Sequence, residues 1–476
     1  MDISSAIILA YFAITLLVSF FCRQRDTALQ KMLAAPQELG VIFMVPLIFS
    51  GLFGGSTVTG TISSAFVGGV SSSWYLIGTA IGCVVFLLLV FPFYRAMSIV
   101  KKSVSIPDAY FHRFDSRTKT LMVLVIVVTN ALALSTIPLS TAGIIANITG
   151  LDYEATVWVC CAVLIGMALL SGLKGVAAMN IVHTLMMFLG LIVLLIPCVK
   201  ETGGMSTLVS ELPANYFDIA DTGFSSIMAV LLGAILAIIT SPLAFMTVVS
   251  SDKPKSAKAS MYICAALIVP FCVCLVIIGM CCKVIAPDLP SNVALYDVAK
   301  SFNTLCYVFI SMSVLAATFS TAPASLLSII TTLNNDIFRV IKKDATEKEQ
   351  KIFVNVGVVV LAIVLMLIGK NAPSILGQLT GATQIKSVAS VVLIVAIWWK
   401  RVDTDGAFYS LLVGSVVAMG WHMAGNPMGI QPLWPALTVT AVVLLALTLP
   451  KKKVSDSYAN YQKIMDEFHA LPKDKQ

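Results

Sequence analysis

The amino-acid sequence predicts an all-α integral membrane protein. Of its 476 residues, 58% are hydrophobic and 12% are charged, and the mean hydropathy is +0.94. Soluble domains contain about 25% charged residues, so this composition indicates a chain that crosses the bilayer several times. About thirteen apolar stretches reach the ~20 residues that a spanning helix needs.

The predicted spans follow one another with short polar loops between them. They lie at about 4–22, 41–68, 74–96, 120–148, 155–172, 175–199, 223–249, 259–282, 302–330, 352–369, 374–399, 406–422 and 432–450. The eleven cysteines fall mainly inside these stretches, without CxxC spacing. We interpret them as small buried side chains rather than as metal ligands or disulfides.

The charges of the loops predict the orientation. With the N-terminus placed outside, 26 of the 31 Lys and Arg residues lie on the cytoplasmic side and 4 on the opposite side. Cytoplasmic loops carry such an excess of positive charge. We therefore expect a multi-pass protein of the plasma membrane, with the N-terminus outside and the C-terminus in the cytoplasm. The net charge of +7 then reflects topology, and we expect no nucleic-acid partner.

Two of the predicted spans are interrupted. The second span reads FSGLFGGSTVTG, and its glycines allow the helix to unwind and expose backbone carbonyls. The seventh contains Thr240-Ser241-Pro242, where proline removes a helical hydrogen bond. The seventh span begins five spans after the second. Because five is odd, the second half is inserted upside down, a pattern typical of transporters whose site lies at mid-membrane.

This symmetry divides the chain into five parts. They are the first span with its cytoplasmic loop (1–40), the first five-helix repeat (41–200), the inverted second repeat (201–400), two peripheral spans (401–450) and a cytoplasmic tail (451–476). The tail is short and polar, so we expect no appended enzyme or sensor domain.

The segment 311–339 is apolar but rich in hydroxyl groups, among them the adjacent pair Ser320 and Thr321. Two adjacent hydroxyls can face one small cation if backbone carbonyls from another segment complete its oxygen shell. Such hydroxyls also bond to neighbouring helices or to the preceding helical turn. From the residues alone both interpretations remain open, and the structural one is the commoner.

Two ionisable side chains lie inside predicted spans. Apart from Tyr and Cys, these are Lys386 and His183, which lie deep within their spans, whereas every Asp and Glu can be assigned to a loop or a terminus. Ionisable residues within a membrane are candidates for function, because their burial is costly. The alternatives are that Lys386 snorkels or faces a water-filled vestibule, and that His183 makes a helix–helix contact.

Five motifs, in the right order along nearly the whole chain, resemble those of the sodium:solute symporter family, which includes proline, pantothenate, sugar and choline transporters. The matching segments are SGLFGGST with Gly60 (50–57), SIPDAYFHRF (105–114), SGLKGV (171–176), AATFSTA with Asp336 (316–322) and WKR with Gly406-Ala407 (399–401). The resemblance implies a five-plus-five inverted-repeat (LeuT-type) core, with one helix before it and two after it. It also implies that 171–176 forms a turn between two spans.

The resemblance further implies a sodium site that joins the first and eighth core helices. By position, its ligands are the carbonyls of Ser50, Phe53 and Ala317 and the hydroxyls of Ser320 and Thr321. Uncharged oxygens suit an ion that must be released again. The resemblance thus favours the functional interpretation of the hydroxyl pair, with Na+ as the coupling ion and no organic cofactor.

The resemblance also suggests residues that contact the substrate. Thr57 falls where family members place a substrate-contacting side chain, and Gln378 lies near a lining position on the tenth core helix. Lys386 points to a small polar solute that is anionic or zwitterionic, such as an amino acid or a small carboxylate, although the family also moves sugars. We expect sodium-coupled symport by alternating access, without enzymatic activity, by a functional monomer in the lipid bilayer.

Departures from the family pattern keep alternatives open. Asn180 and His183 stand where many members carry Asp and Gln, and the acid helps sodium to leave, so these residues are candidates for a coupling or exit pathway. With Lys386 they favour an alternative, proton-coupled or cation-independent transport on the same fold. A membrane sensor without turnover and a channel are further alternatives.

Overall fold

The computed structural model describes residues 6–7, 10–11, 13–15, 17, 39–137, 141–142, 144–145, 152–291, 293–369 and 375–472. In these ranges the regular elements are helices, which confirms the predicted all-α membrane fold. Nine of the described helices are long and apolar enough to cross a membrane, and three shorter ones are also apolar. The count of thirteen spans stays a prediction, since most of the first span and its loop lie outside the described residues.

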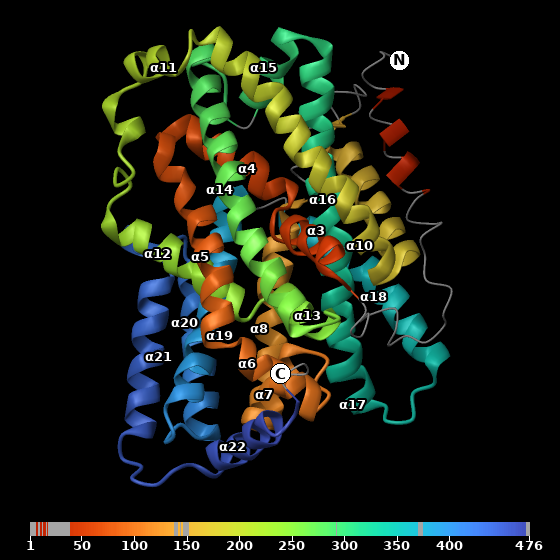
Figure 1. The fold of residues 1–476 in the computed structure, drawn as a ribbon, viewed down its shortest axis with the longest axis vertical. Helices are drawn as coiled ribbons and strands as arrows, with labels where there is room; N and C mark the ends of the chain where they lie inside the picture. Colours follow the sequence, from red (N-terminus) through yellow and green to blue (C-terminus); the bar gives the residue numbers. More distant parts are fainter. Residues whose placement is uncertain are drawn as a thin grey trace.

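The helices follow the chain as shown in Figure 1. The first half contains α3 (Val41–Leu52), α4 (Gly55–Gly68), α5 (Trp74–Leu89), α6 (Phe91–Val100), α7 (Ile106–Arg113), α8 (Ser116–Ser135) and α10 (Tyr153–Glu201). The second half contains α11 (Met205–Glu211), α12 (Phe224–Ile239), α13 (Pro242–Ser250), α14 (Pro254–Ile285), α15 (Ala294–Phe302), α16 (Thr304–Leu333), α17 (Arg339–Ile341), α18 (Glu347–Gly369) and α19 (Ile375–Trp398). The last three are α20 (Thr404–Met423), α21 (Leu433–Thr448) and α22 (Asp456–His469).

Both predicted interruptions are confirmed. The second span is divided into α3 and α4 at residues 53–54, and the seventh into α12 and α13 at residues 240–241. The last carbonyls and the first amides of a helix have no partner within that helix. Each break therefore offers unpaired backbone groups in the interior of the molecule.

Backbone pairing joins the two interrupted helices. The Leu39 amide donates to the Ser250 carbonyl at 3.0 Å, and the Asp252 amide donates to the Leu39 carbonyl at 3.2 Å. The residue before α3 is thus attached to the end of α13. The start of the second span and the end of the seventh are therefore held together.

A turn between two spans at 171–176 stays a prediction. The two spans expected on either side of it form one helix, α10, of 49 residues. The segment contains no proline, so every residue keeps an amide that can continue the helix, and glycine weakens a helix without forbidding it. A straight helix of this length would measure about 70 Å, more than twice the ~30 Å hydrocarbon core, so α10 contains both predicted spans.

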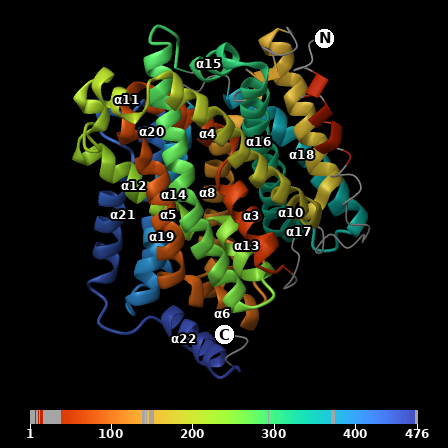
Figure 2. The ribbon, with the colours of Figure 1, turned by 45° about the horizontal axis from the view of Figure 1, so that its top comes forward.

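Helix α16 lies along α10, as Figures 1 and 2 both show. The Ser313 hydroxyl donates to the Met187 carbonyl at 2.9 Å, and the Cys306 thiol donates to the Val193 carbonyl at 3.6 Å. As the residue number rises on one helix it falls on the other, so the two helices are antiparallel. Gly190 permits this approach, because a Cβ there would lie 2.4 Å from the Phe309 carbonyl oxygen.

Candidate functional site

The Ser320–Thr321 pair meets the broken end of α3. The Ser320 hydroxyl donates to the Ser50 carbonyl at 3.0 Å, and the Thr321 hydroxyl donates to the same oxygen at 2.6 Å. Both hydroxyls also reach the Ala317 carbonyl, at 2.8 and 3.1 Å. Four oxygens from two segments about 270 residues apart therefore converge on one point, which local bonding within α16 alone does not explain.

The break in α3 frees the carbonyls that this cluster uses. Ser50 lies in the last turn of α3, where carbonyls have no partner within the helix. The Thr57 amide, which would bond to Phe53 in a continuous helix, donates instead to the Gly54 carbonyl at 2.9 Å. The Phe53 carbonyl is thereby released from the helical pattern next to the cluster.

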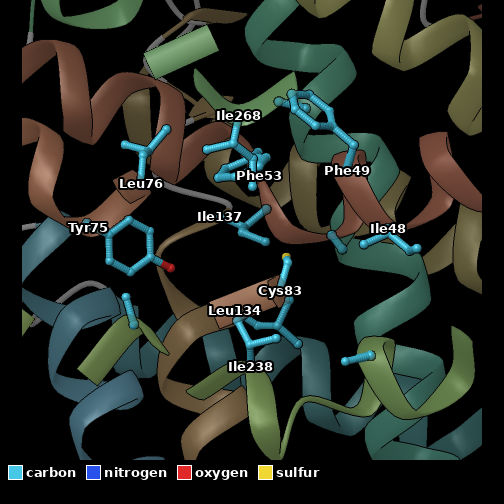
Figure 3. Close-up of a cluster of buried hydrophobic side chains, with 14 of the residues drawn as sticks. Ile48, Phe49, Phe53, Tyr75, Leu76, Cys83, Leu134, Ile137, Ile238 and Ile268 are labelled. Atoms are coloured by element: carbon cyan, nitrogen blue, oxygen red, sulfur yellow. The ribbon is translucent and has the colours of Figure 1, made fainter. Parts of the chain in front are cut away.

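Four phenylalanines hold this end of α3 in place. Phe49 on α3 and Phe53 at the break form one cluster with Phe188 of α10 and Phe271 of α14, in which neighbouring ring centroids lie 5.0–5.5 Å apart. Figure 3 shows Phe49 and Phe53 among the buried apolar side chains. Because neighbouring rings in an interior are close-packed, they restrict movement of the carbonyls between them.

The donor set fits a sodium ion. Ser50, Phe53, Ala317, Ser320 and Thr321 supply three carbonyls and two hydroxyls, which are hard, uncharged oxygen ligands. Each is buried except Thr321, which is partly exposed. At this set of oxygens a monovalent ion would exchange water for protein oxygens, without a carboxylate that would retain it.

Thr321 also borders a cavity of about 160 Å³ in the middle of the molecule. Both broken helices, α5, α8, α16 and α19 contribute to its walls. Its polar lining residues are Ser56, Thr57, Tyr75, Thr79, Asn130, Ser241, Thr321, Ser325, Thr383 and Lys386. In Figure 3, Tyr75, Leu134, Ile137 and Ile238, which all line the cavity, surround a common space. The proximity of the oxygen cluster and the cavity means that occupants of the two can influence each other.

A wider opening lies beside this cavity. It has a volume of about 510 Å³ and is lined from the later part of α4, from α5, α12 and the start of α19. Tyr75 lines both spaces. Tyr75 is therefore shared by the walls of the cavity and of this opening.

Lys386 reaches the cavity from the middle of α19. Its ammonium donates to the Asn130 side-chain oxygen of α8 at 2.9 Å. An ammonium has three N–H donors, so two are left over from this bond. The structure thus places the predicted residues Thr57, Thr321 and Lys386 around one space.

Gln378 is not brought to this cavity. Its side-chain oxygen lies 3.3 Å from Nε2 of His422 on α20, and the side chain is buried. The neighbouring residue Leu379 faces the cavity instead. Helix α19 is therefore rotated so that 379, 383 and 386 face inward, at the i, i+4, i+7 spacing of one helical face.

Asn180 and His183 lie on α10, behind the oxygen cluster. The antiparallel pairing of Met187 with Ser313 puts Asn180 near the level of Ser320. The amide of Asn180 is buried and has no hydrogen-bond partner among the described residues. His183 faces the first span instead, where its Nδ1 lies 2.8 Å from the Tyr11 hydroxyl. Their role in a coupling or exit pathway stays a prediction.

Sequence reasoning missed Asn130, Tyr75 and Thr383. Each lies inside a predicted span close to other polar residues, and polar residues in membrane helices also serve to hold helices together. For Asn130 a signal was available: a buried lysine in the membrane needs a polar partner, and few polar side chains lie within the spans.

The broken helices, the uncharged oxygen cluster and the central cavity beside it define the class of a secondary active transporter. The profile of the sodium:solute symporter family matches residues 32–414, and the chain belongs to this family. It is therefore a sodium-coupled symporter, with Na+ as its coupling ion. The members of this family are transporters. Membership of the family supports sodium coupling over the proton-coupled, cation-independent and sensor alternatives.

Curated relatives and solved structures agree with this assignment. The chain is 23% identical to the high-affinity proline transporter PutP of Bacillus subtilis (strain 168), over 95% of this chain and 100% of that one. It is 22% identical to the sodium/proline symporter of Staphylococcus aureus, over 94% and 92%. An outward-open Na+-coupled sialic acid symporter has a TM-score of 0.78 at 17% identity, covering 94% of this chain and 97% of that chain. Mhp1, a nucleobase-cation-symport-1 family transporter, has a TM-score of 0.58 at 14% identity, covering 92% and 100%. These similarities confirm the LeuT-type fold.

Proposed function

We propose that sodium binds at Ser50, Phe53, Ala317, Ser320 and Thr321, and that a small polar solute binds in the adjoining cavity. The observation that carries this proposal is that Ser320 and Thr321 both reach the Ser50 carbonyl across the break in α3. No other pair of helices in the described part of the chain is joined by two adjacent hydroxyls on one freed carbonyl in this way. The same oxygens are the ligands implied by the family motifs.

The two sites are coupled through shared elements. Sodium bridges α3 and α16, and Gly54 and Thr321 border both the ion and the solute. A Cβ at Gly54 would lie 3.4 Å from the Thr321 hydroxyl, so the break and α16 are in close contact. An ion that holds these elements together stabilises the cavity shape that the solute needs, and the coupling equals the difference in affinity between conformations.

The test is the thermal stability of the purified protein in sodium chloride against choline chloride at equal ionic strength. A ligand that binds the native state alone raises its stability by mass action. We expect Ser320→Ala and Thr321→Ala each to raise the sodium concentration of half-maximal stabilisation about tenfold, since losing one ligand costs about 1–2 kcal/mol.

Thr331→Ala is the matched control. Its hydroxyl lies on the same helix but donates to the Leu327 carbonyl one turn earlier. Sodium stabilisation should be unchanged in this variant. Equal sodium dependence in the wild type and in the Ser320→Ala/Thr321→Ala double variant would overturn the proposed ion site.

We further infer that the solute crosses unchanged, without any covalent bond being made or broken, and that one chain is sufficient. Both proposed sites are built from residues of a single chain. Reconstitution at fewer than one chain per vesicle, on average, should retain sodium-driven uptake. Uptake that disappears at this dilution would show that a second copy is required.

We also infer that the N-terminus lies outside and the C-terminus in the cytoplasm of a cell whose plasma membrane holds the protein. The inference rests on the distribution of Lys and Arg, of which 26 lie on one predicted side and 4 on the other. Under this orientation the wider opening beside Tyr75 faces the outside of the cell.

A further inference from the structure

The charge of the central cavity is set by one side chain. Lys386 lies near the middle of the 24-residue helix α19, so it is far from the aqueous phase at either end. Its single hydrogen bond among the described residues goes to the neutral amide of Asn130. Two N–H donors of the ammonium remain for whatever occupies the cavity.

No counter-charge balances Lys386 within the cavity. Among the described residues that line it there is no Asp or Glu. The proposed sodium ligands next to it are also uncharged. With sodium bound, the region carries two positive charges and no negative one, and such a surplus in a low-dielectric interior favours entry of an anion.

The backbone adds to this preference. The amides of Gly55 and Ser56 begin α4 after the break at Gly54, where a helix offers no carbonyl partner to its first amides. Gly54, Ser56 and Thr57 border the same cavity as Lys386. A helix N-terminus stabilises negative charge. The N-terminus of α4 and the Lys386 ammonium therefore both favour a negatively charged occupant.

The remaining walls of the cavity are mostly apolar. Leu52, Leu134, Ile238 and Met246 face it from four helices, and Ile137 faces it from just beyond the end of α8. An inorganic anion would lose water against these side chains without replacing it, whereas an apolar carbon skeleton gains from the contact. The volume of about 160 Å³ limits that skeleton to a few carbon atoms.

We propose that the transported solute is a small monocarboxylate without a cationic group, and that its carboxylate binds the Lys386 ammonium. This inference rests on the proposed function, because it assumes that the solute binds in this cavity. The proposed substrate differs from that of the proline-transporting relatives. The amino group of a zwitterion would enter a space that already holds Lys386 and lies next to sodium, and no acidic side chain there would receive it.

The test uses the purified full-length protein in two assays. Thermal stability in sodium chloride is measured with propionate, butyrate, pyruvate, L-proline or glucose, and sodium-driven uptake of the same solutes is measured in proteoliposomes. We expect the monocarboxylates to stabilise the protein and to be taken up, and L-proline and glucose to do neither.

Variants then connect the selectivity to Lys386. Lys386→Met should raise the KM for the monocarboxylates at least tenfold, while Lys386→Arg retains part of the affinity. Lys300→Met is the matched control, because it removes an exposed lysine outside the cavity and should leave the KM unchanged. Because both assays on the wild type report selectivity, the proposal is tested even if Lys386→Met does not fold.

The outcomes distinguish this inference from the function on which it rests. Sodium-driven uptake of L-proline or glucose, with no response to monocarboxylates, would overturn the inference and leave sodium symport through the cavity intact. An unchanged KM in folded Lys386→Met would overturn the role of the lysine. A protein that sodium does not stabilise, and that takes up no solute in a sodium gradient, would contradict the proposed sites themselves.

Discussion

The pair of Lys386 and Asn130 shows how one neighbour defines the chemistry of a buried charge. Asn130 offers an oxygen 2.9 Å from the ammonium but no negative charge, so the lysine is hydrogen-bonded and not neutralised. A carboxylate in the same place would form an ion pair, which is typical of structural lysines in membranes. The amide therefore keeps the positive charge available to a solute.

Asn130→Asp tests this interpretation with an almost isosteric change. The new carboxylate would pair with Lys386 at hydrogen-bond distance and compete with the solute for it. At 4 Å such a pair interacts by about 4 kcal/mol at an effective dielectric constant of 20. We expect the monocarboxylate KM to rise at least tenfold, with the thermal stability in the absence of solute retained or increased.

Asn215→Asp provides the control for the added charge, because Asn215 is exposed on a short 3-10 helix (Ala214–Phe217) before α12. Transport by this variant should match that of the wild type. If Asn130→Asp transports monocarboxylates with the wild-type KM, Asn130 does not govern the charge of the cavity.

The contact of α10 with α16 fixes the position of the helix that bears Ser320 and Thr321. The two helices approach closely because Gly190 faces Phe309 and Ser313, and a Cβ at Gly190 would lie 2.5 Å from the Ser313 Cβ. Small residues allow such approach where packing, rather than the hydrophobic effect, drives the association of helices. The position of Ser320 and Thr321 relative to α3 therefore depends on a glycine on another helix.

Gly190→Ala should displace α16 and weaken both the fold and the ion site. Overpacking of this kind costs about 1–3 kcal/mol, and we expect a lower melting temperature together with a higher half-maximal sodium concentration. The matched control is Gly166→Ala on the same helix, where an added Cβ has no heavy atom within 4 Å. Equal melting temperatures for the two variants would show that the approach of α10 and α16 is not limited by Gly190.

The last helix links the C-terminal tail to the core. Arg113, at the end of α7, is fully buried and donates to the Ala396 carbonyl of α19 at 2.5 Å and to the Ser457 hydroxyl of α22 at 3.1 Å. Its guanidinium also lies 5.4 Å from the centre of the Tyr461 ring. Burial lowers the pKa of Arg113 to about 10, so it stays charged at neutral pH. The tail and α7 therefore lie on the same face, at the lower end of Figure 1.

This arrangement makes the topology testable at two points. We expect a protease site added after Gln476 to be cut in inside-out vesicles and protected in right-side-out vesicles, because the tail shares its face with the basic loop around α7. A site inserted between Pro287 and Asp288, in the loop after α14, should show the opposite pattern. Cleavage of both sites from the same side would contradict the orientation and the number of spans between them.

Properties that depend on residues adjacent in the sequence could be predicted from the sequence. The apolar stretches predict a membrane fold because a spanning helix must satisfy its own backbone and present apolar side chains. The breaks at 53–54 and 240–241 follow from glycine and proline, whose effects on a helix are local. The family motifs then indicated Ser320 and Thr321 together with Ser50, and the structure brings these oxygens within hydrogen-bond distance.

The faces that the helices turn inward could not be predicted in this way. Helix α19 is apolar around most of its circumference, so its sequence pattern does not say whether 378 or 379 faces the cavity. Packing against α8, α12 and α20 rotates it so that Lys386 meets Asn130, 256 residues earlier in the chain, while Gln378 meets His422. The membrane class and the helix breaks are thus encoded in local sequence, and the proposed ion ligands follow from the family motifs. The charge of the cavity comes instead from contacts between helices that are distant in the chain.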